Sequence, residues 1–197
     1  MIKEKQLEDL KNICEKCYAC EIGSRRDKMV FSAGNPNAKV VFIGEAPGKD
    51  ENAQGLPFVG RAGQLLNTYL EKVDINRERD LYIANILKCR PTNPDRPNKD
   101  RVPATSEIKN CIDYLFKQIE AVRPNLIVLC GGTSLKTLTG KKSIQISKVR
   151  GDVFELELNG HKYNAIAIYH PSYLMQYASQ EQKDVTLEDL KLIKTYV

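Results

Sequence analysis

The sequence predicts an α/β fold in a single domain, with a central four-stranded, mostly parallel sheet, helices on both faces and a small β-hairpin addition. Two patterns support this prediction. Short apolar runs rich in β-branched residues alternate with segments whose apolar residues recur at helical spacing, which is typical of parallel sheets. The pair Asn159-Gly160 separates the last two runs and indicates a hairpin turn. The 197 residues, without internal repeat or linker, suit one domain over residues 1–197.

Each expected element follows from a local pattern. Helices are expected where apolar residues share one face, as Leu7, Leu10 and Ile13 do near the N-terminus. A helix capped by Thr105 or Ser106 is expected to run to Val122. The other helices are expected over residues 62–73, after Gly131-Gly132 and over 185–196, and the first one over 2–20. The expected strands are residues 39–43, 81–87, 125–130, 152–158 and 162–168. Residues 90–103 hold four prolines and are expected to form a long polar loop.

Composition and charge limit the cellular context. No stretch approaches the roughly 18 apolar residues that a membrane span needs. The charged start, Met1 to Gln6, has no apolar signal region behind it, so we expect a cytoplasmic protein without membrane contacts. A monomer is expected.

The net charge of +5 alone does not identify a partner, but the charge distribution is uneven. Between Glu120 and Asp152 there is no acidic residue, although six basic residues lie there: Arg123, Lys136, Lys141, Lys142, Lys148 and Arg150. This segment is either a solvated basic face or a surface that follows a phosphate backbone. In the second case Lys148 and Arg150 are candidate DNA contacts.

Six cysteines favour metal or redox chemistry over disulfides in a cytosolic chain. Cys17-x-x-Cys20 has metal-ligand spacing, and Cys89 and Cys111 could complete a four-sulfur site that ties the N-terminal helix to the proline-rich loop. Cys14 offers a second register with Cys17; we favour Cys17 and Cys20. Cys130 ends an apolar run and is expected in the core. Spacing alone does not separate zinc from an iron–sulfur cluster.

Two loops distant in sequence carry the acid/base candidates. Gly44-Glu45-Ala46-Pro47-Gly48 and His170-Pro171-Ser172-Tyr173-Leu174 each follow an apolar, strand-like run. Because parallel strands end at one edge of a sheet, Glu45 and His170 are expected to face a common ligand. A glycine-rich run from Gly55 to Gly63 opens a helix, and the aromatic ring of Phe58 within it could stack on a planar group.

These motifs, together with Asn85-x-x-Lys88-Cys89-Arg90-Pro91, resemble those of the family 4, iron–sulfur uracil-DNA glycosylases. The resemblance runs from about Cys17 to the C-terminus. It implies a DNA repair enzyme of base excision repair that hydrolyses the N-glycosidic bond of uracil, releasing uracil and leaving an abasic site. Uracil-containing DNA, single- or double-stranded, is the implied partner, and the mechanism would be monofunctional with base flipping. The implied cofactor is a structural 4Fe-4S cluster on Cys17, Cys20, Cys89 and Cys111, with zinc as the less favoured metal.

The resemblance also implies roles for individual residues. Phe58 would stack on the flipped base and Asn85 would read its edge, although Asn85 could also be a simple turn former. His170 would stabilise the leaving uracil, and Glu45 would orient water beside an oxocarbenium-like sugar rather than act as a surface or capping glutamate. The implied substrate contacts are Gly44, Ala46, Gly48 and Ser172. The implied minor-groove wedge is Tyr173, Leu174 and Met175.

Two departures from the family limit the resemblance. Residues 90–110 are longer than expected and contain no histidine, so a covalently trapping relative of this superfamily would lack its nucleophile here. Met175-Gln176 stand where the family commonly has an arginine. The alternatives are a non-catalytic uracil-DNA-binding member of the superfamily and a zinc-stabilised α/β protein with another activity.

Overall fold

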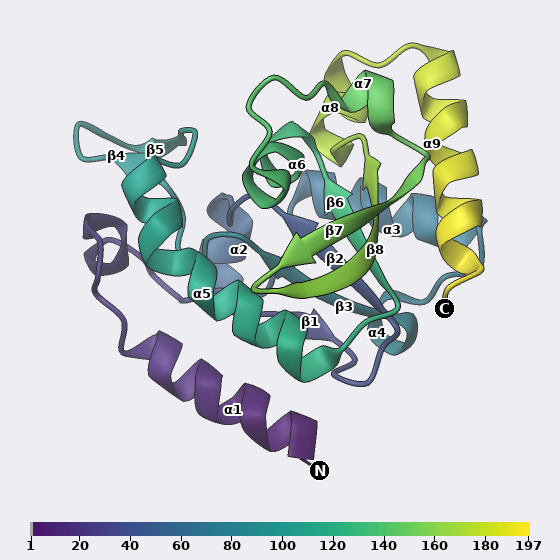
Figure 1. Ribbon diagram of the computed structural model, residues 1–197. Coiled ribbons are helices and arrows are strands. Elements are labelled where there is room, and N and C mark those ends of the chain that lie inside the picture. The colour runs from purple at the N-terminus through teal and green to yellow at the C-terminus, as the bar shows by residue number, and fades with distance from the viewer. Residues whose placement is uncertain (1) are drawn as a thin grey trace.

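A six-stranded sheet forms the centre of the computed structural model, which describes residues 2–197 (Figure 1). Four parallel strands lie side by side in the order β3, β2, β6, β8, and short antiparallel strands β1 and β7 pair at the two edges. The strands are β1 (Ala33–Gly34), β2 (Val40–Gly44), β3 (Leu81–Asn85), β6 (Leu126–Cys130), β7 (Val153–Leu158) and β8 (His161–Ile168). All four central strands therefore end at one edge of the sheet.

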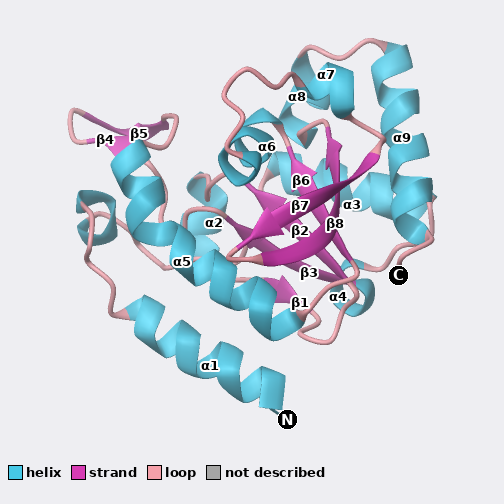
Figure 2. Cartoon of the chain, viewed as in Figure 1, coloured by secondary structure: helices cyan, strands magenta, loops and turns pink. Residues whose placement is uncertain are grey.

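Helices cover both faces of the sheet (Figure 2). On one face lie α1 (Ile2–Glu15), α5 (Thr105–Val122) and α6 (Gly132–Thr139); on the other lie α3 (Arg61–Lys72), α8 (Pro171–Gln176) and α9 (Gln180–Lys194). The short helices are α2 (Lys49–Gln54), α4 (Arg77–Asp80), α7 (Ile146–Val149) and a 3-10 turn over Glu21–Ser24.

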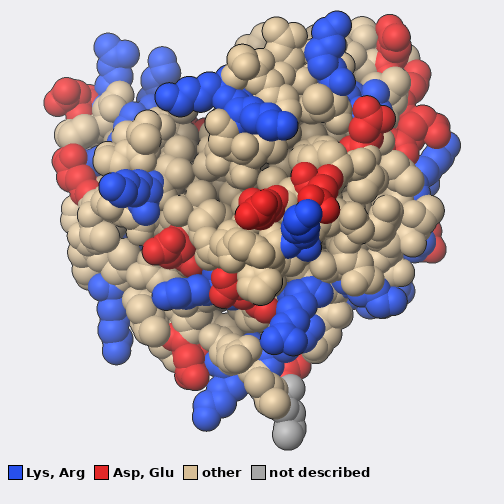
Figure 3. All heavy atoms as spheres, in the orientation of Figure 1, with Lys and Arg blue, Asp and Glu red and all other residues tan. Residues whose placement is uncertain are grey.

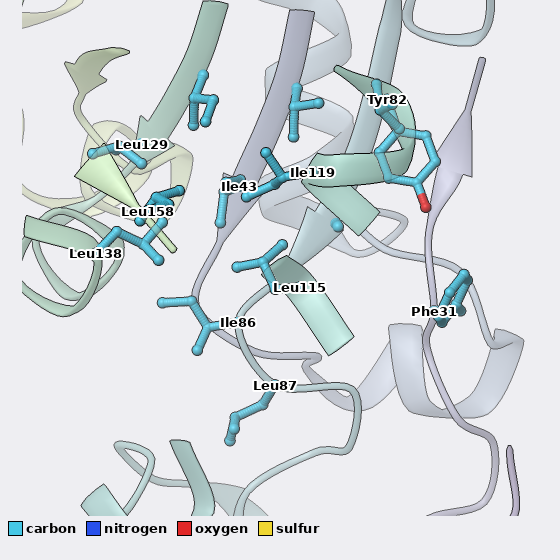
Figure 4. Close-up of a cluster of buried hydrophobic side chains, with 14 of the residues drawn as sticks. Phe31, Ile43, Tyr82, Ile86, Leu87, Leu115, Ile119, Leu129, Leu138 and Leu158 are labelled. Atoms are coloured by element: carbon cyan, nitrogen blue, oxygen red, sulfur yellow. The ribbon is translucent and has the colours of Figure 1, made fainter. Parts of the chain in front are cut away.

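The alternation of side chains along each strand builds two apolar cores. In β2, Val41 and Ile43 face the α1–α5 side, whereas Val40 and Phe42 face the α3–α9 side. Figure 4 shows the first core, where Ile43 lies close to Leu115 and Ile119 of α5. All of these strand side chains are fully buried, as expected for parallel strands covered on both faces.

The predicted fold class is confirmed, with corrections to the size of the sheet and to several boundaries. The sheet has six strands rather than four, because the two-residue β1 is too short to leave a sequence pattern and because β7 pairs along the outer edge of β8. The first helix ends at Glu15, not Cys20, since tighter turns replace the helix after Ile13. The second strand ends at Asn85 rather than Leu87, and the last helix begins at Gln180.

The proline-rich segment is also more ordered than a loop. It contains a separate two-stranded hairpin, β4 (Thr92–Asn93) with β5 (Arg96–Asp100), which lies apart from the main sheet near the start of α5 (Figure 1). The next helix begins at Thr105 with Ala104 as its cap, because the Glu107 carboxylate accepts a hydrogen bond from the Ala104 amide at 2.8 Å.

None of the helices within residues 2–197 is both long and apolar enough to cross a membrane.

Candidate active site and cysteine cavity

A cleft of about 390 Å³ opens where the four parallel strands end. Glu45 follows β2, Asn85 ends β3, Gly131 follows β6, and His170 lies two residues beyond β8, so residues remote in sequence share one wall. Both residues of the predicted acid/base pair therefore line a common cleft. The other lining residues are Ala46, Pro47, Gly48, Glu51, Phe58, Ala62, Pro91, Asp100, Arg101, Cys130, Gly132, Thr133 and Ser172.

Gly44 ends β2 directly behind the cleft and lies against both Phe58 and Asn85, which line it. A β-carbon at this position would come within 2.3 Å of Asn85 Oδ1 and 2.7 Å of the Phe58 ring, so only glycine fits. The Phe58 ring also meets Phe42 edge-on, with centroids 5.9 Å apart, and lies 6.0 Å from the His170 ring. The aromatic ring and the amide thus lie against the same glycine.

Phe58 adopts an unusual backbone conformation, with φ of +54°. The helix α3 passes close behind it, and a β-carbon at Gly63 would lie 1.9 Å from the Phe58 carbonyl oxygen. Arg77 donates to that carbonyl at 2.8 Å and to the Pro57 carbonyl at 2.9 Å. The strained turn that presents the ring is therefore held by bonds from outside it.

Glu51 fixes the same loop from the other side. Its Oε1 accepts hydrogen bonds from the amides of Val59 and Gly60 at 2.9 and 2.8 Å, and its Oε2 accepts one from Gly48 at 3.2 Å. Sequence reasoning missed Glu51, although the spacing Gly48-x-x-Glu51 at the start of a helix is that of a capping box with glycine in place of serine. Glu51 thus joins the two predicted substrate loops.

Asn85 has a buried side chain that the protein leaves without a partner. The residue is 3% exposed, and within residues 2–197 its side-chain amide makes no hydrogen bond. Asn85 lines the cleft, and its amide is not among the fully enclosed unpaired atoms, so its donor and its acceptor are available to a ligand. A turn former would instead bond to its own backbone.

His170 is held as a neutral imidazole. The Ser172 amide donates to its Nδ1 at 3.2 Å, and the Ser172 hydroxyl lies 2.7 Å from the same atom. Because Nδ1 accepts, we assign the ring proton to Nε2. Burial lowers the pKa of His170 to about 4, and the nearby Glu51 carboxylate opposes this shift only in part.

Glu45 lines the cleft and is partly exposed. Among the described residues its carboxylate has no hydrogen-bond or ion-pair partner, while its main-chain oxygen accepts from the Leu87 amide at 3.1 Å. The backbone of Glu45 is thus fixed and its carboxylate is available.

The predicted wedge residues occupy different environments. Leu174 was expected at the DNA surface but is 4% exposed and packs into the core between α3 and α9, because every third to fourth residue of α8 faces inward. The Tyr173 hydroxyl accepts a hydrogen bond from Gln182 at 2.8 Å. Met175 remains exposed, as does Tyr177, which the sequence reading did not single out.

The two basic residues predicted to contact DNA, Arg150 and Lys148, lie in different environments. Arg150 pairs with the buried carboxylate of Asp189 and donates to the Val185 carbonyl at 3.1 Å, so its guanidinium is engaged within the fold. Lys148 is exposed. Figure 3 shows that Lys and Arg side chains gather along the upper edge of the view, over the β4–β5 hairpin and the segment between α6 and α7.

A second cavity gathers the cysteines on the α1–α5 side. It is lined by all four predicted ligands, Cys17, Cys20, Cys89 and Cys111, together with Cys14. Cys130 lies apart and is buried at the end of β6, as expected for core, although it also contacts the cleft. Cys17 and Cys20 follow α1 in a loop rather than standing on the helix.

The residues of this cavity suit a group bound by thiolates, but the cysteines are not arranged as a complete metal site in the described residues. All six cysteines are free thiols, and within residues 2–197 no three His, Cys, Asp or Glu side chains are grouped so as to hold a metal ion. Burial raises the pKa of the Cys111 thiol to about 11 and that of Cys14 to about 12. Two cations adjoin the sulfurs: Arg26 donates to Cys89 Sγ at 3.4 Å, and Lys88 lines the cavity. Thiolates and adjacent cations fit an anionic cluster, and no carboxylate lines the cavity.

Other lining residues were also missed by sequence reasoning. Gly131, Gly132 and Thr133 begin α6 at the cleft, and the signal for them was the glycine pair directly after a strand. Asp100 and Arg101 reach the cleft from the hairpin, which had left no recognisable pattern.

The sequence of the chain is similar to those of known proteins. A family model described as the uracil DNA glycosylase superfamily matches residues 31–191. The chain is 38% identical to a type-4 uracil-DNA glycosylase of Thermotoga maritima, with 99% of this chain and 96% of the relative covered. It is 41% identical to the type-4 enzyme of Archaeoglobus fulgidus, with 86% and 83% covered, and 36% identical to that of Saccharolobus solfataricus, with 91% and 81% covered. The chain belongs to the uracil-DNA glycosylase superfamily and, within it, to the type-4 uracil-DNA glycosylases.

Proposed function

We propose that this protein is a DNA repair hydrolase that removes uracil from DNA by cleaving its N-glycosidic bond, leaving an abasic site. The observation that carries the proposal is the buried, unpaired amide of Asn85 beside the ring of Phe58. The type-4 relatives, named as uracil-DNA glycosylases, support the same activity. Water is the second reactant, and the products are free uracil and a deoxyribose hemiacetal.

Recognition of uracil follows from the amide. A single carboxamide can donate to O4 of uracil and accept from N3–H, whereas cytosine presents the opposite pattern at both atoms. Phe58 offers a face for stacking of the flipped base. Gly44 lets the base approach this wall, because a side chain there would already collide with Asn85 and Phe58.

Departure of the base is the step that His170 assists. As the glycosidic bond breaks, negative charge builds on the uracil ring, and the Nε2–H of a neutral imidazole can donate to that charge near O2. Ser172 holds the imidazole by bonding to Nδ1 and is thereby proposed to position the catalytic group. His170 is a donor rather than a general acid in this scheme, since burial keeps the proton on one nitrogen only.

Glu45 is proposed to act on the sugar side of the bond. Its free carboxylate would offset the positive charge of an oxocarbenium-like sugar and orient the attacking water. Gly48 and Ala46 would contribute backbone contacts from the same loop. The amide of Gly48 is already bound to Glu51, which leaves the loop rigid rather than open.

DNA is proposed to run across the cleft mouth, with exposed Met175 and Tyr177 on one side and exposed Lys148 among the basic groups that face the phosphates. Tyr173 and Leu174 would support this surface from within, and Arg150 would support it through Asp189. Action as a cytoplasmic monomer and as one domain over residues 1–197 stays a prediction.

Cys17, Cys20, Cys89 and Cys111 are proposed to hold a 4Fe-4S cluster. Glycosidic hydrolysis transfers no electrons, so such a cluster would serve as a structural cross-link between the segment after α1, the end of β3 and helix α5. Zinc is the alternative metal for the same thiols.

The test is to incubate the purified chain with oligonucleotides containing uracil, thymine or hypoxanthine, and to quantify iron, sulfide and zinc on the same sample. We expect uracil release, no thymine release, and about four iron atoms per chain. Binding to uracil-containing DNA without base release would instead indicate a non-catalytic member, and zinc without iron would overturn the cluster.

A further inference from the structure

Lys88 is a buried lysine that the proposed reaction does not use. The residue is 1% exposed, and its Nζ donates to the Gln118 side chain at 2.6 Å and to the main-chain oxygen of Asn85 at 2.7 Å. The Phe31 ring lies 6.0 Å from the same nitrogen. A lysine is rarely buried to this degree unless its hydrogen bonds matter to the structure around it.

Gln118 ties this lysine to the rest of the fold. Its Nε2 donates to the Phe31 carbonyl at 3.1 Å and to the Tyr82 hydroxyl at 3.0 Å, while its Oε1 accepts from Lys88. Gln118 is itself fully buried on α5, and Tyr82 stands in β3, three residues before Asn85. The hydrogen bonds therefore connect helix α5 to the end of the strand that carries the uracil-reading amide.

The backbone around Asn85 is held on both sides. The Lys88 ammonium donates to the carbonyl of Asn85. The next amide, that of Ile86, donates to the carbonyl of Gly44 at 3.0 Å. The peptide plane between Asn85 and Ile86 is thus fixed at the end of β3. This fixes the direction in which the Asn85 side chain leaves the backbone, although the amide at its tip has no protein partner of its own.

We propose that Lys88 is a positioning residue for Asn85 and thereby contributes to uracil recognition. The inference rests on the proposed function and deepens it, because it assigns a role to a residue outside the cleft. The ammonium of Lys88, braced by Gln118, holds the strand end so that the amide meets the base without reorganisation.

Lys88 also borders the cysteine cavity, since its backbone amide donates to Cys111 Sγ at 3.3 Å. The test must therefore separate positioning from damage to that cavity. Iron and sulfide content and the unfolding midpoint are measured on every variant, alongside activity.

The experiment is a double-mutant cycle of Lys88→Met with Asn85→Ala. We expect Lys88→Met to lower kcat/KM for uracil-containing DNA by about 10- to 100-fold. In the Asn85→Ala background the same change should have little further effect, because the group that it positions is gone. Affinity for DNA with a tetrahydrofuran abasic analogue, which has no base to read, should change by less than about twofold.

Lys3→Met is the matched control, since Lys3 also donates to a main-chain oxygen, that of Val122 at 2.8 Å, where α5 ends one turn beyond Gln118. It should leave kcat/KM unchanged. If Lys88→Met does not fold, Gln118→Met in the same cycle takes its place and should show the same non-additivity at smaller size.

Two results would overturn the inference while the wild-type protein still releases uracil: independent, multiplicative effects in the cycle, or a parallel loss of affinity for the abasic analogue. A wild-type protein that releases no uracil would contradict the proposed function itself, which is a separate outcome.

Discussion

The cleft and the cysteine cavity lie at two ends of the same short segment, Asn85 to Cys89, but they are stabilised in different ways. The loops of the cleft are held by the protein's own hydrogen bonds, with Glu51 binding three backbone amides and Arg77 binding two carbonyls. The cysteine cavity brings together three segments, which are joined pairwise by single bonds: Arg26 to Cys89, the Lys88 amide to Cys111, and Asn110 to the Ala19 carbonyl at 2.9 Å. The loops of the cleft are thus fixed by several hydrogen bonds each, whereas the segments of the cavity would gain a further cross-link from the proposed cluster.

The largest expected effect is at the recognition end of the cleft. Asn85→Ala removes the amide that is proposed to read the uracil edge, and we expect kcat/KM to fall by about 1000-fold or more, since a site built to hydrogen-bond its substrate discriminates strongly. Single-turnover assays on uracil-containing DNA measure this. Asn164→Ala, at an exposed position of β8, is the control and should retain full activity. Comparable losses in both variants would contradict the assignment.

The second prediction concerns the cysteine cavity. If the proposed cluster is bound, Cys111→Ser should lower the free energy of unfolding by about 3 kcal/mol through its loss, which for a chain of this length corresponds to roughly 6–12 °C in Tm. Cys14→Ala is the matched comparison, because Cys14 lines the same cavity but lies on α1 in the packed core. It should retain iron. Loss of iron with Cys14→Ala and retention with Cys20→Ala would favour the other register, in which Cys14 pairs with Cys17.

The third prediction is a pH dependence from His170. The unfolded chain binds a proton there near pH 6.5, but the folded chain does so only near pH 4, so the unfolded state binds more protons between these values. The stability contributed by the neutral ring is present above pH 6.5 and is lost as the pH falls toward 4. Between pH 7.5 and pH 5 we expect a loss of about 2 kcal/mol. Urea denaturation at both pH values gives the free energy of unfolding of the wild type and of His170→Gln. An equal loss of stability at pH 5 in both proteins would argue against a neutral His170 ring in the fold.

The smallest expected effect tests how much of the cleft's organisation depends on Glu51. Glu51→Gln keeps an oxygen for the Val59 and Gly60 amides but removes the charge, and we expect a loss of about tenfold in kcat/KM, or roughly 1.4 kcal/mol. Glu71→Gln, on the exposed face of α3, should have no effect. An unchanged Glu51→Gln enzyme would mean that the loop is rigid without this carboxylate.

The sequence predicted the features that depend on periodicity and on motifs. Apolar, β-branched runs gave β2 and β6, and the glycine-rich loops correctly indicated that Glu45, Phe58 and His170 converge. Strand ends and helix ends were placed less well, because Leu87 is as buried as the strand before it although it no longer belongs to β3.

What the sequence could not show was the partner of each polar side chain. Arg150 lies in a basic segment and was predicted to contact DNA at the surface. Its guanidinium instead forms an ion pair with Asp189, which is 39 residues away in the sequence. Leu174 lies in a candidate DNA loop but falls on the inward face of α8. Lys88 stood in a recognised motif with nothing to indicate that it would be buried. Long-range pairing of this kind depends on tertiary packing rather than on local pattern.

The two glycines beside Phe58, Gly44 and Gly63, have a consequence for attempts to change which base is removed. A β-carbon at Gly44 or at Gly63 would collide with Phe58, at 2.7 and 1.9 Å, so neither glycine can be replaced without moving that ring. The lining also includes small residues, Ala46, Ala62 and Thr133, and Asp100 of the separate hairpin. Altered selectivity in this protein, whether selected in the laboratory or by evolution, should therefore arise from these lining residues and the hairpin rather than from Gly44 or Gly63.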